Sequence, residues 1–209
     1  MDIVKLLDEA RAGTDVLRHP FYERWSDGAL TAEELRLYAG QYRHAVVALA
    51  EVSAAAAQSA PPSSRAALER HAEEERFHIE LWDEFARAQD AEPIAPALPQ
   101  TSSCVAAWTA GEDLVERLGV LYALEASQPA ISATKLQGLT EHYGMRNGSP
   151  GVGYFELHAV RDAEHADESA ALLRELAEER DLDRVLAVAE ASLEGNWLLL
   201  DGIDAQRQA

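Results

Sequence analysis

The sequence predicts an all-α protein that folds as a single domain, a bundle of about seven helices. Apolar residues recur three or four positions apart along most of the chain, as they do on one face of a helix. No segment has the apolar–polar alternation of a convincing strand. The 209 residues can bury one substantial core, and a single proline-rich loop at 90–103 does not divide them. Residues 1–209 are therefore expected to form one domain.

Start and stop signals bound the elements expected in the first half of the chain. Thr31 and Glu34 have the spacing of a capping box, in which the two residues satisfy each other's backbone N–H, so a long helix is expected to begin there. It continues to about residue 60 and stops at Pro61-Pro62. The elements expected before it are a helix over 2–13 and a short one, FYERW (21–25), ended by the turn SDG (26–28).

Prolines and glycines divide the second half in the same way. Ser63 or Ser64 is expected to begin a helix that ends near residue 89, and the three prolines of 90–103 indicate a loop. Pro129 is expected to kink the helical stretch that follows, because proline lacks the N–H that a helix needs. The elements expected after the loop are a helical stretch over about 104–144, a turn at NGSPGVG (147–153), and helices over about 154–179 and 182–206.

The charge and the single cysteine exclude several classes of function. With 18 basic and 37 acidic residues the formal net charge is −19, which repels phosphate backbones and anionic lipid. We therefore expect no nucleic-acid or membrane partner, and we leave open a homodimer and the identity of any electron donor. One cysteine, Cys104, allows no internal disulfide, and there is neither a signal-peptide core nor an apolar run near the ~20 residues that span a bilayer. A cytoplasmic protein is expected.

The stretch HAVRDAEHAD (158–167) places three metal-ligating residue types on one face of a helix. His158, Asp162 and His165 are spaced i, i+4 and i+7, which confines them to an arc of roughly 60°. Tyr154 joins the same stripe one turn earlier. For this segment alone, the alternative is a solvated acidic face.

A second segment, RHAEEERFHIELW (70–82), offers a matching pair. Glu75 and His78 have the Glu-x-x-His spacing that di-iron carboxylate proteins use on bundle helices. Glu74 lies four residues before His78 and is the alternative first ligand, while His71 shares the face of His78 and could compete as a ligand. The alternative interpretation is an ordinary charge run on a solvated helix.

A third segment, ERLGVLYALEASQPAIS (116–132), holds one carboxylate in apolar surroundings. Glu125 follows a run of valine, leucine and tyrosine, and burying it unpaired would cost several kcal/mol, so it needs a partner or a metal. Otherwise it faces solvent at a helix rim or accepts a hydrogen bond from a tyrosine. The mixed oxygen and nitrogen donors suit two iron or manganese ions with open positions for O₂, and a structural zinc site would more usually contain cysteines. The predicted ligands are Glu75 (or Glu74), His78, Glu125, His158, Asp162 and His165.

This pattern resembles the haem-oxygenase-like di-metal oxidases, which share a TenA/PqqC-like fold, and within them the CADD-type proteins that make the folate precursor para-aminobenzoate. The resemblance covers roughly residues 15–200. It implies a haem-oxygenase-like helical bundle, two metal ions (Fe/Fe or Fe/Mn), O₂ as co-substrate and an external reductant. The segments that carry it are HPFYERWSDGALTAEELRLYAGQY (19–42), HIELW (78–82), LYALEASQPAISATKLQGLTEHYG (121–144) and YFELHAVRDAEHA (154–166).

The resemblance also implies roles for four further residues. CADD-type enzymes are self-sacrificing: a tyrosine that matches Tyr22 supplies the aromatic ring, and a lysine that matches Lys135 supplies the nitrogen. Tyr154 and Tyr38 match tyrosines of the active site. The sequence departs from the pattern at Leu124, where the family has a tyrosine before the metal glutamate. The segment between the first glutamate and His78 is also about three residues shorter, so alignment does not separate Glu74 from Glu75.

The residues by themselves allow a plainer interpretation of these side chains. Tyr22 and its aromatic neighbours at helical spacing are typical of a packed core, and lysines usually face solvent. A straight helix would place Lys135 about 15 Å from Glu125, so only a kink brings its amine near the metals.

Three functions are therefore weighed. The first is a di-metal oxidase that converts its own Tyr22 to para-aminobenzoate. The second is a di-metal oxidase of a free amino or fatty acid, and the third is a non-enzymatic acidic interaction protein. Thiaminase-like chemistry is disfavoured, since no His/Asp arrangement around Cys104 suggests a thiol nucleophile.

Overall fold

The computed structural model describes residues 2–92, 95–178 and 181–207, and in these residues the protein is all helical, with no strand. This confirms the predicted fold class. The helices are α1 (Ile3–Gly13), a short 3₁₀ helix η1 (Val16–Arg18), α2 (Pro20–Ser26), α3 (Ala32–Ser59), α4 (Pro62–Ala88), α5 (Pro99–Trp108), α6 (Leu114–Glu125), α7 (Gln128–Glu141), α8 (Gly153–Leu176) and α9 (Leu182–Gln206).

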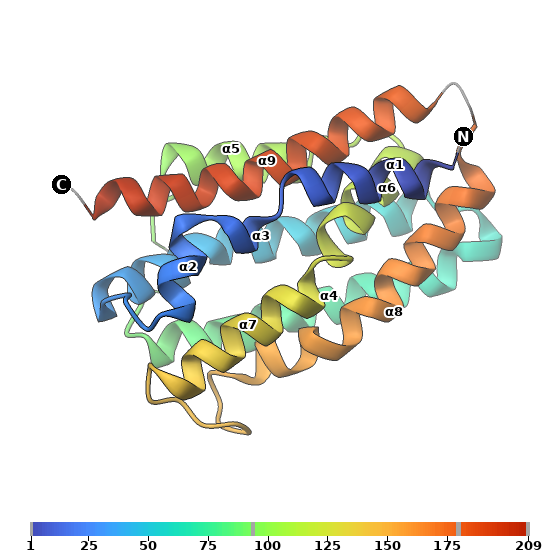
Figure 1. Cartoon of the computed structure of the whole chain (residues 1–209). Coiled ribbons are helices and arrows are strands. Elements are labelled where there is room, and N and C mark those ends of the chain that lie inside the picture. The colour runs from blue at the N-terminus through green and yellow to red at the C-terminus, as the bar shows by residue number, and fades with distance from the viewer. Residues whose placement is uncertain (1, 93–94, 179–180, 208–209) are drawn as a thin grey trace.

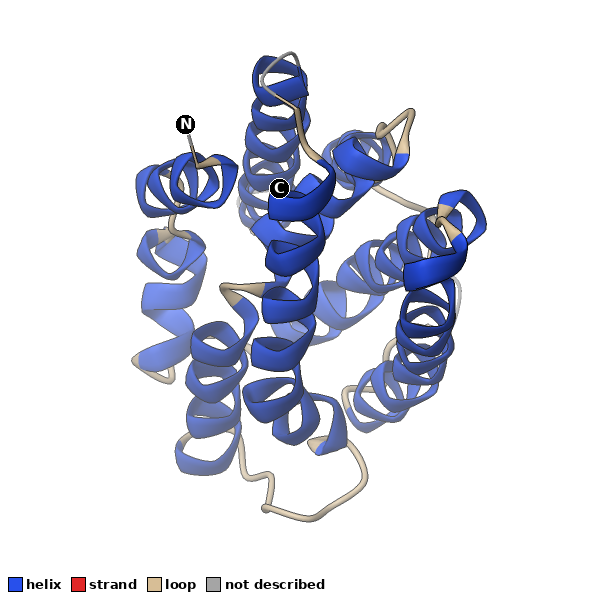
Figure 2. Cartoon of the chain, turned by 90° about the vertical axis from the view of Figure 1, so that its right-hand side faces the viewer, coloured by secondary structure: helices blue, strands red, loops and turns tan. Residues whose placement is uncertain are grey.

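The long helices form a bundle (Figures 1 and 2). The long helices α3 and α4 pack along each other, α7 and α8 pack on one side, and α5 and α9 pack on the other. Helix α6 contacts α1, α3, α8 and α9, which explains its apolar sequence: residues 118–125 are all buried. Glu125, the last residue of α6, is therefore held inside the bundle.

The capping box at Thr31 forms as predicted. The Thr31 hydroxyl accepts a hydrogen bond from Glu34 N at 3.2 Å, and Glu34 Oε2 accepts one from Thr31 N at 2.8 Å. Helix α3 ends at Ser59, and α4 begins at Pro62, one residue before the expected start. Proline at a first helical position leaves no hydrogen bond unmade, because that N–H has no partner within the helix.

The stretch expected as one kinked helix over 104–144 is divided into α5, α6 and α7. Helix α5 begins at Pro99, so the end of the predicted loop is already helical. A new N-cap at Asp113, which accepts from Glu116 N at 3.0 Å, starts α6. The chain then breaks between Glu125 and Gln128, before Pro129, which lies in the first turn of α7 where proline is tolerated. This break lets α7 leave the axis of α6.

Two apolar clusters fill the interior, with polar side chains between them along α4 and α8. On α8 the aromatic cluster includes Tyr154 and Phe155, and the smaller cluster begins at Ala166. On α4 the order is reversed, with Ala72 in the smaller cluster and Trp82 in the aromatic one. The predicted metal-ligating residues of both helices therefore lie where the two clusters meet.

A close approach between α2 and α7 yields a first prediction. A Cβ on Gly138 would lie 2.5 Å from the Trp25 ring, whose Nε1 donates to Lys135 O at 3.1 Å. We expect Gly138→Ala to lower the free energy of unfolding by about 1–3 kcal/mol, measured by urea denaturation without added metal.

Gly13→Ala is the matched control, because a Cβ there meets nothing within 4 Å. It should be neutral or slightly stabilising, as alanine replaces glycine in a helix. Equal stability changes in the two variants would contradict a tight α2–α7 contact.

Candidate metal centre

Seven ionisable side chains from three helices converge in the middle of the bundle, each at most 2% exposed. On α4 and α8 these residues are spaced three or four positions apart, so they lie on one face of each helix, and that face points into the bundle. The seven are His71, Glu75 and His78 from α4, Glu125 from the end of α6, and His158, Asp162 and His165 from α8.

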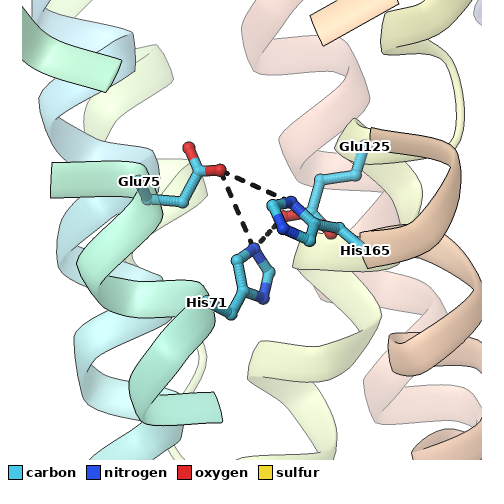
Figure 3. Close-up of side chains that lie close together, drawn as sticks. All are labelled: His71, Glu75, Glu125 and His165. Carbon is cyan, nitrogen blue, oxygen red and sulfur yellow. Dashed lines mark ion pairs between the residues drawn. The ribbon is translucent and has the colours of Figure 1, made fainter. Parts of the chain in front are cut away.

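Four of these side chains form a first group of possible ligands (Figure 3). The donor atoms of His71, Glu75, Glu125 and His165 all lie within 4.8 Å of one another. His71 Nε2 is 2.8 Å from Glu125 Oε1, and His165 Nδ1 is 3.6 Å from Glu75 Oε1. Two imidazoles and two carboxylates at this spacing could hold one divalent ion.

A second group shares one residue with the first. Glu75, His78 and His158 also have donor atoms within 4.8 Å of one another, with His78 Nδ1 3.0 Å from Glu75 Oε1. The His78 and His158 rings lie 4.4 Å apart, centroid to centroid. Because Glu75 belongs to both groups, it could contribute to both ion positions.

The buried donor atoms of these groups have no hydrogen-bond partner among the described residues. Leaving such atoms unpaired costs several kcal/mol when they are charged, so a set of them around one point fits bound cations better than a packed core. The residues present therefore fit a pair of divalent metal ions. The unpaired atoms are His71 Nε2, both Glu75 oxygens, His78 Nδ1, both Glu125 oxygens, His158 Nε2 and His165 Nδ1.

Two further carboxylates orient the histidines of α8. His158 Nδ1 lies 2.7 Å from both Asp162 oxygens, and His165 Nε2 lies 2.9 Å from Glu74 Oε2. Each ring therefore donates its N–H to a carboxylate and turns its other nitrogen to the centre, an arrangement common around metal-bound histidine. Arg161 holds Glu74 through two hydrogen bonds of 2.9 Å.

The structure thus brings together most of the predicted ligands. Glu75, His78, Glu125, His158 and His165 lie in the two groups. Asp162 lies beside them, on His158, and its role as a ligand stays a prediction. His71, named from the sequence only as a competitor, lies inside the first group. Glu74 faces Arg161 with its side chain 29% exposed, which favours Glu75 as the first ligand.

Burial and neighbouring charges act in opposite directions on the carboxylates. Burial raises the pKa of Glu125 to about 7, although the His71 imidazole acts against it. Burial would also raise the pKa of Glu75, but the hydrogen-bonding distance and charge of His78 outweigh it and leave the pKa lowered. The Arg161 guanidinium lowers the pKa of Glu74 to about 2. Of the two carboxylates in the ligand groups, Glu75 therefore supplies anionic oxygen at neutral pH.

Next to the centre, aromatic rings enclose the amine of Lys135. This side chain is 0% exposed, and its Nζ lies 4.4 Å from the centroid of Tyr42 and 5.6 Å from that of Tyr22. Nζ has no hydrogen-bond partner among the described residues. Burial lowers the pKa of Lys135 to about 7, while the charge of Asp162 acts against the shift. The other rings within 6 Å of Nζ are those of Tyr38, Trp82 and Phe155.

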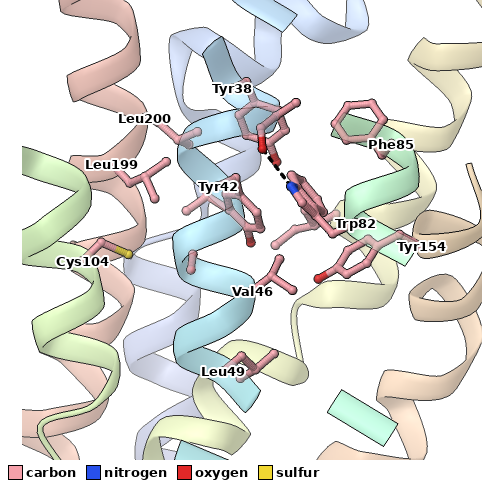
Figure 4. Close-up of a cluster of buried hydrophobic side chains, with 14 of the residues drawn as sticks. Tyr38, Tyr42, Val46, Leu49, Trp82, Phe85, Cys104, Tyr154, Leu199 and Leu200 are labelled. Carbon is pink, nitrogen blue, oxygen red and sulfur yellow. Dashed lines mark hydrogen bonds between the residues drawn. The ribbon is translucent and has the colours of Figure 1, made fainter. Parts of the chain in front are cut away.

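The tyrosines of this pocket connect it to the metal centre. Tyr22 and Tyr38 share a hydrogen bond of 3.2 Å between their hydroxyls. Tyr154 stacks on His158 at 4.1 Å between centroids and contacts Trp82 at 4.8 Å. Figure 4 shows Trp82 between Tyr42 and Tyr154. Burial raises the pKa of Tyr22, Tyr38 and Tyr154 well above the usual value, so all three are protonated at neutral pH.

Sequence reasoning missed three members of the pocket, Tyr42, Trp82 and Phe155. The signal was present as helical spacing, since Tyr42 is four residues after Tyr38 and Trp82 is four after His78. Leu124, where the resemblance expects a tyrosine, is buried in the apolar core beside Glu125. Cys104 is also buried, and burial raises the pKa of its thiol, which does not suit a nucleophile.

The fold and the metal-compatible centre agree with a family match. Residues 36–197 match the model of a haem-oxygenase-like family described as iron-containing redox enzymes. The chain belongs to this family.

Among individual proteins, the chain is similar to two proteins named 4-aminobenzoate synthase. The one from Nitrosomonas europaea is 32% identical, covering 90% of this chain and 85% of its own length. The one from Chlamydia trachomatis is 29% identical, covering 96% of this chain and 91% of its own length.

Solved structures support the fold. A protein of Shewanella denitrificans described as a domain of unknown function with a heme oxygenase-like fold has a TM-score of 0.84 at 24% identity, covering 100% of this chain and 94% of its own. A TenA homologue of Pseudomonas syringae has a TM-score of 0.83 at 16% identity, covering 97% of this chain and 91% of its own. The haem-oxygenase-like fold is thereby confirmed. Among the described residues, no helix is long and apolar enough to cross a membrane.

The placement of Glu74 and Glu75 gives a second prediction. We expect Glu75→Gln to lose most of the bound metal, because its carboxylate is shared by both groups. Glu74→Gln should keep both ions with affinity reduced about 10–100-fold, as for a residue that only orients a ligand. Metal content is measured by elemental analysis after anaerobic loading with Fe(II), together with the rise in melting temperature on loading.

If Glu74→Gln lost most of the metal and Glu75→Gln kept it, the first ligand would be Glu74. Wild-type protein that binds fewer than about one ion per chain, with an unchanged melting temperature, would instead favour the non-enzymatic interpretation.

The buried amine of Lys135 gives a third prediction. Its pKa is about 7 in the folded protein and about 10.4 when unfolded, so between these values only the unfolded chain binds the proton. The free energy of unfolding of the wild type should therefore rise with pH relative to Lys135→Met, by up to about 1.4 kcal/mol per pH unit. Urea denaturation at several pH values between 7 and 10, without metal, measures the difference.

Lys5→Met is the matched control, since the chain has only these two lysines and the Lys5 side chain is 77% exposed. Its difference from the wild type should not change with pH. A flat profile for Lys135→Met as well would mean that Lys135 stays charged in the folded protein.

Proposed function

We propose that this protein is an O₂-dependent di-metal enzyme that makes 4-aminobenzoate from its own Tyr22, with Lys135 as the donor of nitrogen. The observation that carries the proposal is the position of Lys135, a buried amine without a hydrogen bond whose Nζ lies 5.6 Å from the centroid of the Tyr22 ring. Trp82 of the same pocket contacts Tyr154, which lies against His158 of the metal centre. The relatives named 4-aminobenzoate synthase support the product.

The proposed metal ligands are the six residues that the sequence predicts. His78 and His158 would hold one ion and Glu125 and His165 the other, Glu75 belongs to both groups, and Asp162 lies beside His158. Two bound ions, Fe/Fe or Fe/Mn, would supply O₂-dependent oxidising power, with electrons from an external reductant.

The pocket residues hold and prepare the reacting groups. Tyr22 has the carbon skeleton of the product: its phenol oxygen must be replaced by nitrogen, its Cα–Cβ bond must break, and Cβ must be oxidised to the carboxyl group. Tyr38, at 3.2 Å, is placed to exchange a proton with the Tyr22 hydroxyl. Tyr154 lies between the metal centre and the pocket. The apolar rings exclude water, which would compete with the amine for the ring.

The lowered pKa of Lys135 serves the proposed transfer of nitrogen. An amine attacks only in its neutral form, and burial makes that form substantially populated at neutral pH. The separate axis of α7, set by the break after Glu125, allows the side chain to point into the pocket although it follows Glu125 by ten residues.

Isotope labelling tests this function. Protein labelled with ¹⁵N only in lysine, loaded anaerobically with iron or with iron and manganese, is given O₂ and a reductant. We expect less than about one 4-aminobenzoate per chain, carrying ¹⁵N, and loss of the side-chain mass from the Tyr22 peptide. Mass spectrometry of the product and of the protein digest measures both.

Tyr22→Phe should abolish the product, whereas Tyr122→Phe should not, because the Tyr122 hydroxyl bonds Asp8 and lies outside the pocket. If Tyr22→Phe made as much 4-aminobenzoate as the wild type, the self-sacrificing mechanism would be wrong. It would favour the alternative, a di-metal oxidase of a free amino or fatty acid.

A further inference from the structure

We propose that His71 is a direct metal ligand, joining Glu125 and His165 at one of the two ion positions. The centre then takes four imidazoles in place of the three that the resemblance implies. This inference deepens the proposed function, and it rests on the metal centre of that function alone, not on its product.

The position of the His71 nitrogen supports this role. Nε2 is 2.8 Å from Glu125 Oε1 and 3.8 Å from Glu75 Oε1, and its ring stacks on that of His165 with centroids 4.0 Å apart. Figure 3 shows the nitrogen turned toward the space between the other three side chains. The donor atoms of all four residues lie within one ligand-sized volume.

A histidine that only filled the core would have its ring nitrogen paired. His71 Nε2 is close to Glu125, but a ring N–H there would not point at the oxygen, and both atoms are without a hydrogen bond among the described residues. By contrast, the equally buried His19 accepts from Phe21 N at 3.0 Å and contacts Asp201 Oδ1 at 3.2 Å. Donor atoms that lie within 4.8 Å of one another without hydrogen bonds between them are what a set of ligands around an ion would show.

The comparison with Asp162 points the same way. Both Asp162 oxygens are within 2.7 Å of His158 Nδ1, so this carboxylate already has a partner. The Nε2 atom of His71 makes no hydrogen bond among the described residues, although it lies 2.8 Å from Glu125 Oε1. An imidazole also adds a donor to a centre that already holds buried carboxylates, without adding further negative charge to its surroundings.

Paramagnetic NMR counts the bound imidazoles without relying on activity. Protein labelled with ¹⁵N in histidine is loaded anaerobically with Co(II), which shifts the ring resonances of coordinated histidines far from the others. We expect shifted signals from His71, His78, His158 and His165 in the wild type. His71→Gln should lose one set and should bind Co(II) more than about tenfold more weakly at one position.

His142→Gln is the control, a partly exposed histidine away from the centre, and should lose no shifted signal. Retention of every shifted signal in His71→Gln would overturn the inference. If that variant fails to fold, as judged by circular dichroism, the wild-type count decides: three shifted imidazoles overturn the inference and four support it.

The outcome is separable from that of the proposed function. Wild-type protein that binds no Co(II) overturns this inference together with the metal centre. Co(II) binding with four imidazoles, in a protein that makes no 4-aminobenzoate, supports the inference and removes only the proposed product.

Discussion

The structure is organised around a set of ionisable side chains that are buried where water cannot pair with them. Such burial is costly, and here it is concentrated at one place, where the aromatic cluster and the smaller apolar cluster meet along α4 and α8. Helix α6, surrounded by other helices, brings Glu125 to the same point. Each His–carboxylate contact outside the centre then fixes which ring nitrogen faces inward, as Asp162 does for His158 and Glu74 for His165. These two contacts orient the histidines only because the other buried ligands lie at the same place.

The break between α6 and α7 links this centre to the pocket of Lys135. A continuous helix would have directed Lys135 elsewhere, whereas the separate axis of α7 packs it against Tyr22 and Tyr42. Trp25 Nε1 donates a hydrogen bond to Lys135 O. The ring can approach this closely because Gly138 has no side chain. The same burial that keeps the pocket dry also lowers the pKa of the amine, so one packing arrangement both positions the amine and favours its neutral form.

Much of this was accessible from sequence, and the exceptions have physical reasons. The helical class, the capping box at Thr31 and the stripe of α8 follow from local spacing, and the structure has them. Whether Glu74 or Glu75 faces the centre does not, because neighbours on a helix differ by 100° and tertiary packing sets the rotation. The division of 104–144 depended on the cap at Asp113 and on burial around α6. The pocket around Lys135 is formed by contacts between helices that are far apart in sequence, so no local sequence pattern predicts it.

Tyr22 is 1% exposed and belongs to the larger apolar cluster. If its ring leaves as product, the chain loses one of its largest core side chains, and emptying such a site costs about 3–5 kcal/mol, a large part of the total stability of an ordinary domain. The spent protein would therefore be a chemically altered chain with a hole in its interior and a raised population of unfolded molecules. Proteases that sample unfolded chains could then distinguish used from unused copies by stability alone.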